Sequence, residues 1–533
     1  MIYILCLEKY SKLEVKMSNL IYTGSSWNFD KLYRMMDACE EIAINDMGLD
    51  CFPNQLEIIT VEQMLDAYSS VGMPLMYNHW SFGKSFIQNK QNYSVGRMGL
   101  AYELVINSNP CINYLMEENS MTTQGLVIAH AAFGHNHFFK NNYLFQQWTS
   151  PDAIVDYLLF AKKYVRECEE RYGTDAVEET LDACHAIQYQ SINKYKRPNK
   201  ISAREEIEQQ RTRSEYLQSQ VNDLWRTLPN SKKKEDKNLL EKGWPAEPEE
   251  NLLYFLEKHS PILTSWQREM CRIVRRVAQY FYPQYQTKVM NEGFASFTHH
   301  HIFNELYNQG KVDDGAMLEF FKLHSSVLYQ PSFDSPNYNG FNPYALGFAI
   351  LKDIQRVCTE PDEEDKQWFP HLADTDWRIA IKDIAANYRD ESAILQFLGP
   401  KVIRDQGMFN LHDEIHYDNY LVTSIHNERG YKKIRKNLAA SYETAAMIPD
   451  IQITNADITN TRDLTLLHES YKGKRLDKKT ADQVLSHVQK LWGYKVKLYT
   501  MNDNTLLDVY ECKQLSNSKV GTSPLDDHGD QWN

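Results

Sequence analysis

Residues able to bind a metal ion are concentrated in two short segments of the chain, residues 116–139 and 288–307. Both segments place polar side chains among apolar and aromatic residues, where a buried polar group needs a partner. The first segment carries His130 and His135, and the second carries Glu292. Two histidines completed by a carboxylate are the ligands of many hydrolytic zinc sites. The residue types therefore predict a metal site made of these three side chains, with zinc as the candidate ion.

The spacing of the histidines conflicts with one regular α-helix. Five residues turn an α-helix by about 140° beyond one full turn, so His130 and His135 cannot bind one ion side by side. His130 and His137 share a face, but about 10 Å of rise separates them. We therefore expect the helix to break near Gly134, or the remaining ligands to come from elsewhere, with Glu292 as the natural donor.

Two acidic residues precede the histidines, and a structural alternative needs no metal at all. Glu117 and Glu118 are candidates for a catalytic base or for a supporting role around the ligands. In the alternative, buried histidines and a glutamate act as hydrogen-bond hubs in an aromatic-rich helical body. That alternative accounts for His79, His130, His135 and Glu292. The run His299–His301 can turn at most one or two rings inward, so we expect at least one to be a surface residue.

A second pattern resembles half of a di-iron site. Glu178, Asp182 and His185 fall on one helical stripe, and Asp182 to His185 imitates the Glu-x-x-His motif of di-iron bundles. Such a site needs two copies, and the other D-x-x-H, Asp413 to His416, falls in a predicted sheet. The di-iron centre is therefore the weaker hypothesis.

Composition excludes several classes of function. A net charge of −13 and a pI near 5.8 weigh against nucleic acid as a partner, because phosphate binding needs surplus Lys and Arg. The nine cysteines are scattered without a C-x-x-C pair, which is typical of reduced thiols in a cytoplasmic protein. No run of 18 apolar residues predicts a membrane span. No P-loop, dinucleotide fingerprint or G-x-S-x-G elbow is found.

The periodicity predicts a large helical domain over residues 17–400. Helices are expected from Ser150 to Gly173, from Thr174, and over Ser265–Phe281 up to a break at Pro283. Residues 1–16 read as an extension in front of a true start at Met17, and residues 199–250 as a charged insertion.

After residue 400 the apolar period shifts towards two. The order strand, strand, helix, strand, strand, helix, strand predicts a small α+β domain over residues 401–505, with Gly493 closing its second helix. We expect a disordered tail over 506–533. Two loops rich in Tyr, Asn, Pro and Gly, residues 77–86 and 329–354, are either pocket walls for a polar ligand or plain packed loops.

Long stretches of the chain resemble the stage V sporulation protein R (SpoVR) family. They include "YNHWSFGKSF", "MEENSMTTQGLVIAHAAFGHNHFF", "VMNEGFASFTHHHI", "NPYALGFAILKDIQRVC" and "DESAILQFLGPKVIRD", and span Tyr77 to Asp405. The resemblance implies a bacterial, cytoplasmic protein linked to the spore cortex, a peptidoglycan layer. The family also occurs in bacteria that do not sporulate, and the resemblance supplies no biochemical activity.

A second likeness concerns the site. "NEGFASF" is similar to the segment of thermolysin-like aminopeptidases that supplies the third zinc ligand, and "HAAFGH" to their H-E-x-x-H helix. This comparison matches Glu292 to the third ligand and His130 and His135 to the pair, in a zincin-like body. Four residues, not three, separate the histidines, and Ala131 stands where the catalytic Glu belongs. A base would then come from Glu117 or Glu118.

The sequence thus predicts a mainly α protein, with a large helical N-terminal domain and a small α+β C-terminal domain. Its expected role is in cell-envelope or spore-cortex formation, by metal-assisted hydrolysis if it is an enzyme. The alternative is a non-catalytic regulatory or scaffold protein that docks protein partners through its acidic surface or C-terminal sheet.

Overall fold

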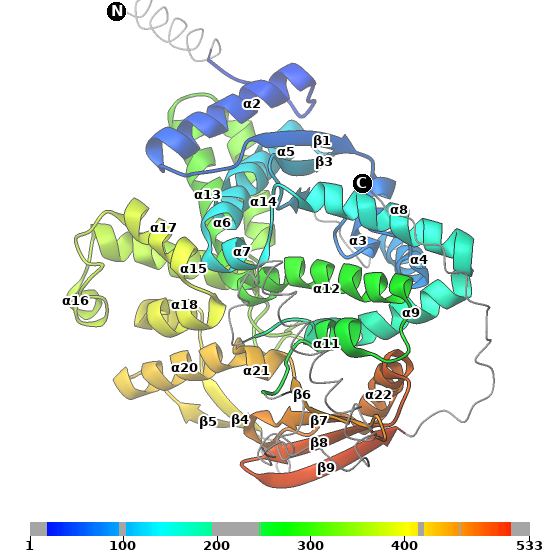
Figure 1. The fold of residues 1–533 in the computed structure, drawn as a ribbon. Helices are drawn as coiled ribbons and strands as arrows, with labels where there is room; N and C mark the ends of the chain where they lie inside the picture. The colour runs from blue at the N-terminus through cyan, green and yellow to red at the C-terminus, as the bar shows by residue number, and fades with distance from the viewer. Residues whose placement is uncertain are drawn as a thin grey trace, which may run out of the picture. The chain divides into compact units, whose positions relative to one another are not determined.

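The computed structural model describes residues 19–94, 103–194, 245, 247–413, 420–457 and 460–512. The described chain is mainly helical and has a small α+β region near its C-terminus, which confirms the predicted fold class. The expected N-terminal extension and almost all of the expected charged insertion lie outside the described residues. Figure 1 shows the order of the elements along the chain.

The chain divides into two compact units, and each is built from two stretches of sequence. The first unit contains the residues up to Tyr172 and Gln279–Met447, and the second contains Gly173–Ala278 and the residues from Ile448 onward. This division at Met447 lies later than the domain boundary expected near residue 400. The reason is that Tyr431 belongs to the same apolar core as the helices before residue 400.

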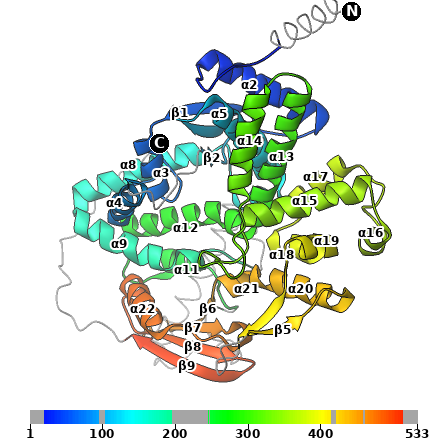
Figure 2. The same ribbon diagram turned by 180° about the vertical axis from the view of Figure 1, so that it is seen from behind.

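The first unit is a helical body with two small sheets. Its helical elements are α2 (Phe29–Glu41), η1 (Ile42–Asp46), α3 (Val61–Ser69), α4 (Trp80–Ser94), α5 (Met121–Val127), η2 (Ile128–His135), α6 (Asn136–Asn141), α7 (Tyr143–Trp148), α8 (Ile154–Tyr172), α13 (Lys288–Asn308), α14 (Asp314–Val327), α15 (Pro343–Thr359), α16 (Glu363–Trp368), α17 (Trp377–Asn387), α18 (Asp390–Phe397), α19 (Pro400–Asp405), α20 (Glu428–Ser441) and α21 (Thr444–Met447). The helix α13 is the centre of this body, since η2, α14 and α15 all pack against it. Figure 2 shows α14 beside α13.

A three-stranded sheet in the first unit was not predicted from the sequence. Its order is β1 (Asn54–Ile59), β3 (Cys111–Met116) and β2 (Glu103–Ile106), with β1 parallel and β2 antiparallel to β3. The chain passes from β3 through a short turn into α5 and η2, so this sheet fixes where η2 begins. A separate antiparallel pair is formed by β4 (Asn410–Asp413) and β5 (Tyr420–Ser424).

The second unit contains the larger sheet. Four strands pair in the order β6 (Asp450–Ala456), β7 (Leu464–Glu469), β8 (Val496–Asn502) and β9 (Thr505–Cys512). The parallel strands β7 and β8 are joined by α22 (Lys478–Trp492), which packs on the sheet and against α9 (Thr174–Ala186). Gly493 ends α22 in the left-handed conformation, at φ 89°, as the sequence predicted. The unit also holds η3 (Gln188–Gln190), α11 (Leu252–His259) and η4 (Tyr471–Gly473).

Two expectations about chain ends and helix breaks were wrong. The expected disordered tail includes residues 506–512, which instead form most of β9, because they complete the sheet along β8; residues 513–533 lie outside the described part. The helix α12 (Ser265–Gln286) continues past Pro283. A proline in the last turn removes only one backbone hydrogen bond, and the hydroxyl of Thr287 donates to the Pro283 carbonyl at 2.7 Å.

Candidate metal centre

The segment that carries both histidines is a π-helix, η2. At its end the Asn136 N–H donates to the Ala131 carbonyl, five residues back, where an α-helix would use the fourth. The wider turn of a π-helix reduces the angle between residues five apart, so His130 and His135 lie close to one face. Their ring centroids are 4.6 Å apart. The expected break near Gly134 does not occur, because the wider helical turn resolves the spacing instead.

Polar side chains from outside the helix hold this unusual turn. Asn54, on the edge strand β1, donates from Nδ2 to the Ala132 carbonyl at 3.0 Å. Asn136 donates to Asn54 Oδ1 and to the Phe52 carbonyl, both at 2.8 Å, and accepts from the Phe52 N–H. Strand β1 and η2 are therefore joined by amide side chains that satisfy backbone groups.

Glycines let three helices approach closely at this level. A Cβ added to Gly134 would lie 2.6 Å from the Cα of Ala295, so η2 touches the backbone of α13. On α13, a Cβ added to Gly293 would lie 2.4 Å from Gly347 of α15. Real Cβ atoms are not found at such short distances. Because these glycines have no Cβ, the helices can approach closely enough for Glu292 of α13 to reach the histidines.

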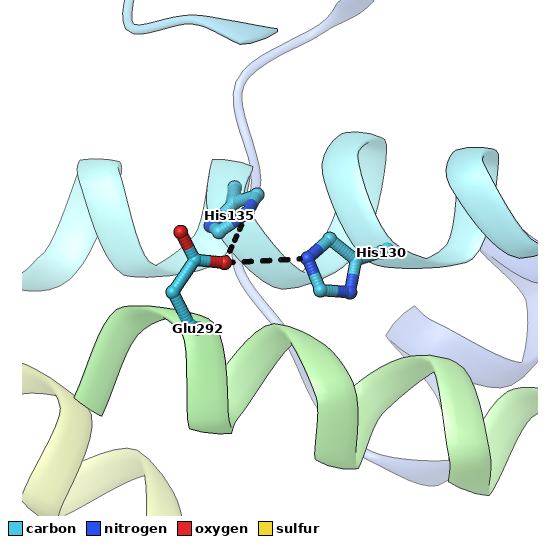
Figure 3. A group of neighbouring side chains, drawn as sticks. All are labelled: His130, His135 and Glu292. Carbon is cyan, nitrogen blue, oxygen red and sulfur yellow. Dashed lines mark ion pairs between the residues drawn. The ribbon is translucent and has the colours of Figure 1, made fainter. Parts of the chain in front are cut away.

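The three predicted ligands meet between η2 and α13. Glu292 Oε2 lies 3.4 Å from His135 Nε2 and 3.6 Å from His130 Nε2. Figure 3 shows this oxygen directed between the two rings, while the other oxygen points away. Among the described residues, these three form the group of His, Cys, Asp or Glu side chains whose donor atoms are close enough to share an ion, all within 4.8 Å.

Hydrogen bonds at Nδ1 orient both rings. His135 Nδ1 is 2.9 Å from Asn291 Oδ1, a pure acceptor, so the ring carries its proton there and turns a lone pair at Nε2 toward Glu292. His130 Nδ1 lies 2.8 Å from His299 Nδ1, and His299 Nε2 lies 2.7 Å from His324 Nδ1. One consistent set of neutral tautomers runs along this chain when His130 Nδ1 donates, which again leaves Nε2 as the lone pair.

The carboxyl group of Glu292 is held in its ionised form. Burial opposes ionisation of Glu292, but His135 and His130 outweigh it and hold the pKa of this carboxyl well below its usual range. Burial lowers the pKa of His299 well below its usual range, and His130 and His324 add to this effect. The group is therefore a carboxylate facing imidazoles, with neutral imidazole behind them.

The first turn of α13 is tied down by a buried acid that the sequence did not reveal. Asp390 accepts the N–H groups of Val289 and Met290, each at 2.9 Å. Burial raises the pKa of Asp390 to about 7, against the opposing effect of these N–H groups. Since Asn291 and Glu292 follow directly, Asp390 fixes where both side chains emerge. Asp390 stands at the start of α18, about 100 residues away along the chain, so no local spacing pointed to it.

The structure does not bring Glu117 and Glu118 to the group. Both are exposed in the turn after β3, and the backbone of Glu117 accepts a hydrogen bond from the Trp27 indole at 3.0 Å. Their role as a base remains a prediction.

The other histidines considered in the sequence analysis lie outside the group of three. His79 packs in the first unit, with Nδ1 2.6 Å from the Ser81 hydroxyl. His299 is fully buried, while His300 and His301 are half-buried. The expectation that one of the run is a plain surface residue was wrong, because His301 Nε2 pairs with Asp46 at 2.6 Å.

The di-iron pattern stays incomplete. Glu178, Asp182 and His185 lie on α9 in the second unit, and they form no group close enough to share an ion among the described residues. His416 lies outside those residues. The two segments expected as loops are partly helical, since α4 begins at Trp80 and α15 at Pro343. The helix α15 contributes Tyr344, whose ring stacks on His130 with 6.3 Å between the centroids.

Fold and site together define a mainly helical protein with a buried pair of histidines facing one glutamate. The chain matches the family model "SpoVR like protein" over residues 26–447 and the model "SpoVR-like C-terminal domain" over residues 449–503. It belongs to the SpoVR family. The boundary between these models coincides with the division of the compact units at Met447, whereas Gly173–Ala278 of the second unit lies within the first model.

A relative matches nearly the full length of the chain. "Uncharacterized protein YcgB" from Escherichia coli (strain K12) is 52% identical over 489 residues, which cover 92% of this chain and 95% of the relative. No solved structure matches the chain. None of the helices in the described part has the length and hydropathy needed to cross a bilayer.

Proposed function

We propose that His130, His135 and Glu292 hold a divalent metal ion. The observation that carries this proposal is the spacing around Glu292 Oε2, which lies 3.4 and 3.6 Å from the two Nε2 atoms. These separations exceed a direct hydrogen bond. In a tetrahedral site with bonds of about 2.1 Å, neighbouring ligand atoms lie about 3.4 Å apart.

The surroundings support the same reading. Glu292 Oε2 is buried and makes no hydrogen bond to the described residues, whereas metal ligation would satisfy it. Both rings hold their Nδ1 atoms against a partner, as metal-binding histidines do. The side chain of Glu292 retains 18% exposure, so it is not fully enclosed.

Metal-assisted hydrolysis is the chemistry we propose for this centre. A bound zinc ion would polarise a water molecule or a substrate carbonyl at neutral pH. His130, His135 and Glu292 would hold the ion. Tyr344 and Phe139, stacked on the two rings, would shield the ion from bulk water. Glu117 and Glu118, the bases expected from the sequence, lie outside the group, so either could act as the base only if its side chain or the substrate moved. The role we propose is in cell-envelope or cortex formation. We place the protein itself in the cytoplasm, where free cysteines such as those of the described residues are stable.

A non-catalytic regulatory or scaffold protein is the second candidate. A specific observation favours it: His135 and His130 hold Glu292 in its ionised form, and a protonated imidazole would neutralise that carboxylate without any ion. In that case the group would be a structural ion-pair cluster.

Elemental analysis of the purified protein separates these candidates. We expect about one equivalent of zinc or iron, since two histidines and a carboxylate also bind non-haem iron. His135→Ala and Glu292→Gln should lose the metal. His79→Ala, which removes a buried histidine outside the group, should keep it. Metal-free wild-type protein after expression in metal-supplemented medium would reject the proposal and leave the structural cluster.

A further inference from the structure

A second polar site lies further along α13, on the side facing α15. A pocket of about 170 Å³ is lined by Phe297, His300, His301, Asn304, Lys352 and Gln355. Eight residues separate Glu292 from His300, which places the pocket about 12 Å along the helix from the candidate metal centre.

The ammonium group of Lys352 has no acidic partner among the described residues. It lies 2.7 Å from Gln355 Oε1 and 5.8 Å from the centre of the Phe297 ring. Burial lowers the pKa of Lys352, and no carboxylate offsets that cost. The half-buried ammonium group contacts an amide oxygen and an aromatic ring, and neither neutralises its positive charge.

The acid that contacts the pocket lining is already paired. Asp46 accepts from Arg378 and pairs with His301, both at 2.6 Å, so its charge is balanced by the Arg378 guanidinium. The rest of the lining consists of neutral hydrogen-bonding groups. Asn304 donates to the His300 carbonyl at 2.6 Å, and burial lowers the pKa of His300 to about 3, so its ring is neutral.

We propose that this pocket binds a small oxyanion, the carboxylate or phosphate group of a ligand, on Lys352. The volume is below that of pockets for drug-sized molecules, about 300–1,000 Å³, so it suits one anionic group rather than a whole sugar or peptide. The ammonium supplies the charge, while the amides and imidazoles supply directional hydrogen bonds. The proposal does not depend on a metal at Glu292.

Titration calorimetry of the full-length, chelator-treated protein tests it, with inorganic phosphate in one series and acetate in another. We expect saturable binding of at least one anion, weakened tenfold or more in Lys352→Gln and retained in Lys352→Arg. Phosphate alone would identify a phosphate group, and acetate alone a carboxylate. The matched control is Lys322→Gln, which removes the same charge from an exposed site on α14 and should bind as wild type does.

Three outcomes would overturn the proposal: no saturable binding of either anion, wild-type binding by Lys352→Gln, or loss of binding in Glu292→Gln. The last would place the anion at the metal centre. Metal content of Lys352→Gln should equal that of the wild type, so failure of this pocket and failure of the proposed metal centre give different results.

Discussion

Asn291 and Glu292 are adjacent on α13, yet they act on the same histidine from two sides. Asn291 Oδ1 accepts at Nδ1 of His135, and Glu292 faces its Nε2 at 3.4 Å. An amide oxygen accepts only, so it fixes the tautomer that a metal ligand requires. The sequence placed Glu292 correctly beside the histidines but did not identify Asn291, because a helix turns adjacent residues by about 100° and hides such pairs.

Removing the amide should weaken metal binding without removing a ligand. We expect Asn291→Ala to bind zinc about 10–100-fold more weakly than wild type, the usual effect of losing a group that orients a ligand. Asn291→Asp keeps an acceptor at the same position and should restore most of the affinity. Competition with a chromophoric chelator measures both, and equal affinities for wild type and Asn291→Ala would show that the His135 ring is oriented by other contacts.

The elements around the site explain what one sequence can and cannot reveal. The apolar period predicted a largely helical domain over residues 17–400, and the spacing showed correctly that one α-helix could not present His130 and His135 together. They did not predict a π-helix, because that conformation is maintained by Asn54 and Asn136 through contacts across about 80 residues. The three-stranded sheet was missed for a similar reason, since β2 is short and β3 pairs with β1 from far earlier in the chain.

The close contact between η2 and α13 should be sensitive to a single methyl group. Gly134→Ala places a Cβ 2.6 Å from the Ala295 Cα, so the helices must separate. We expect a loss of about 1–3 kcal/mol in unfolding free energy and weaker metal binding, as for other overpacked cores. Chemical denaturation and metal analysis provide the two measurements.

Gly83→Ala is the matched control for that substitution. A Cβ at Gly83 on α4 meets no atom within 4 Å, so alanine should be neutral or should stabilise the helix by about 0.5–1 kcal/mol. Equal stability losses in the two variants would argue against the tight contact at Gly134.

At the scale of the whole molecule, composition and apolar period were sufficient for the fold class and for most strands and the two helices after residue 400. The compact units could not be read from the same patterns. Each unit is assembled from two separated stretches, and α20 joins the first unit through side chains such as Tyr431. Binary patterning shows that a helix buries one face, but it does not show against which neighbour.

Acid should destabilise the fold through histidines that are buried neutral. Burial lowers the pKa of His324 to about 4 and that of His300 to about 3, with Lys352 and neighbouring histidines adding to the effect. His324 is faced by His299, His300 and the charge of Lys352. The unfolded chain takes up these protons near pH 6.5, above the folded pKa values. Stability is therefore complete above pH 6.5 and falls as the pH drops toward 4.

Urea unfolding of the chelator-treated protein between pH 7.5 and 4.5 measures this dependence. We expect wild type to lose a few kcal/mol over that range, and His300→Gln to lose less. The use of metal-free protein keeps the acid-induced release of a bound metal out of the comparison. If the free energy of unfolding did not change down to pH 5, these rings would take up protons in the folded protein as readily as in the unfolded chain.

The asparagine link between β1 and η2 sets a minimum length for any working fragment. A piece beginning after residue 60 would still contain His130, His135 and Glu292, yet it would lack the amide that donates to Ala132. Without that support the widened turn is free to relax into an ordinary α-helix, which would swing one imidazole away from the other. Excising the ligand-bearing helices would therefore yield a peptide with all three donors and no chelating geometry.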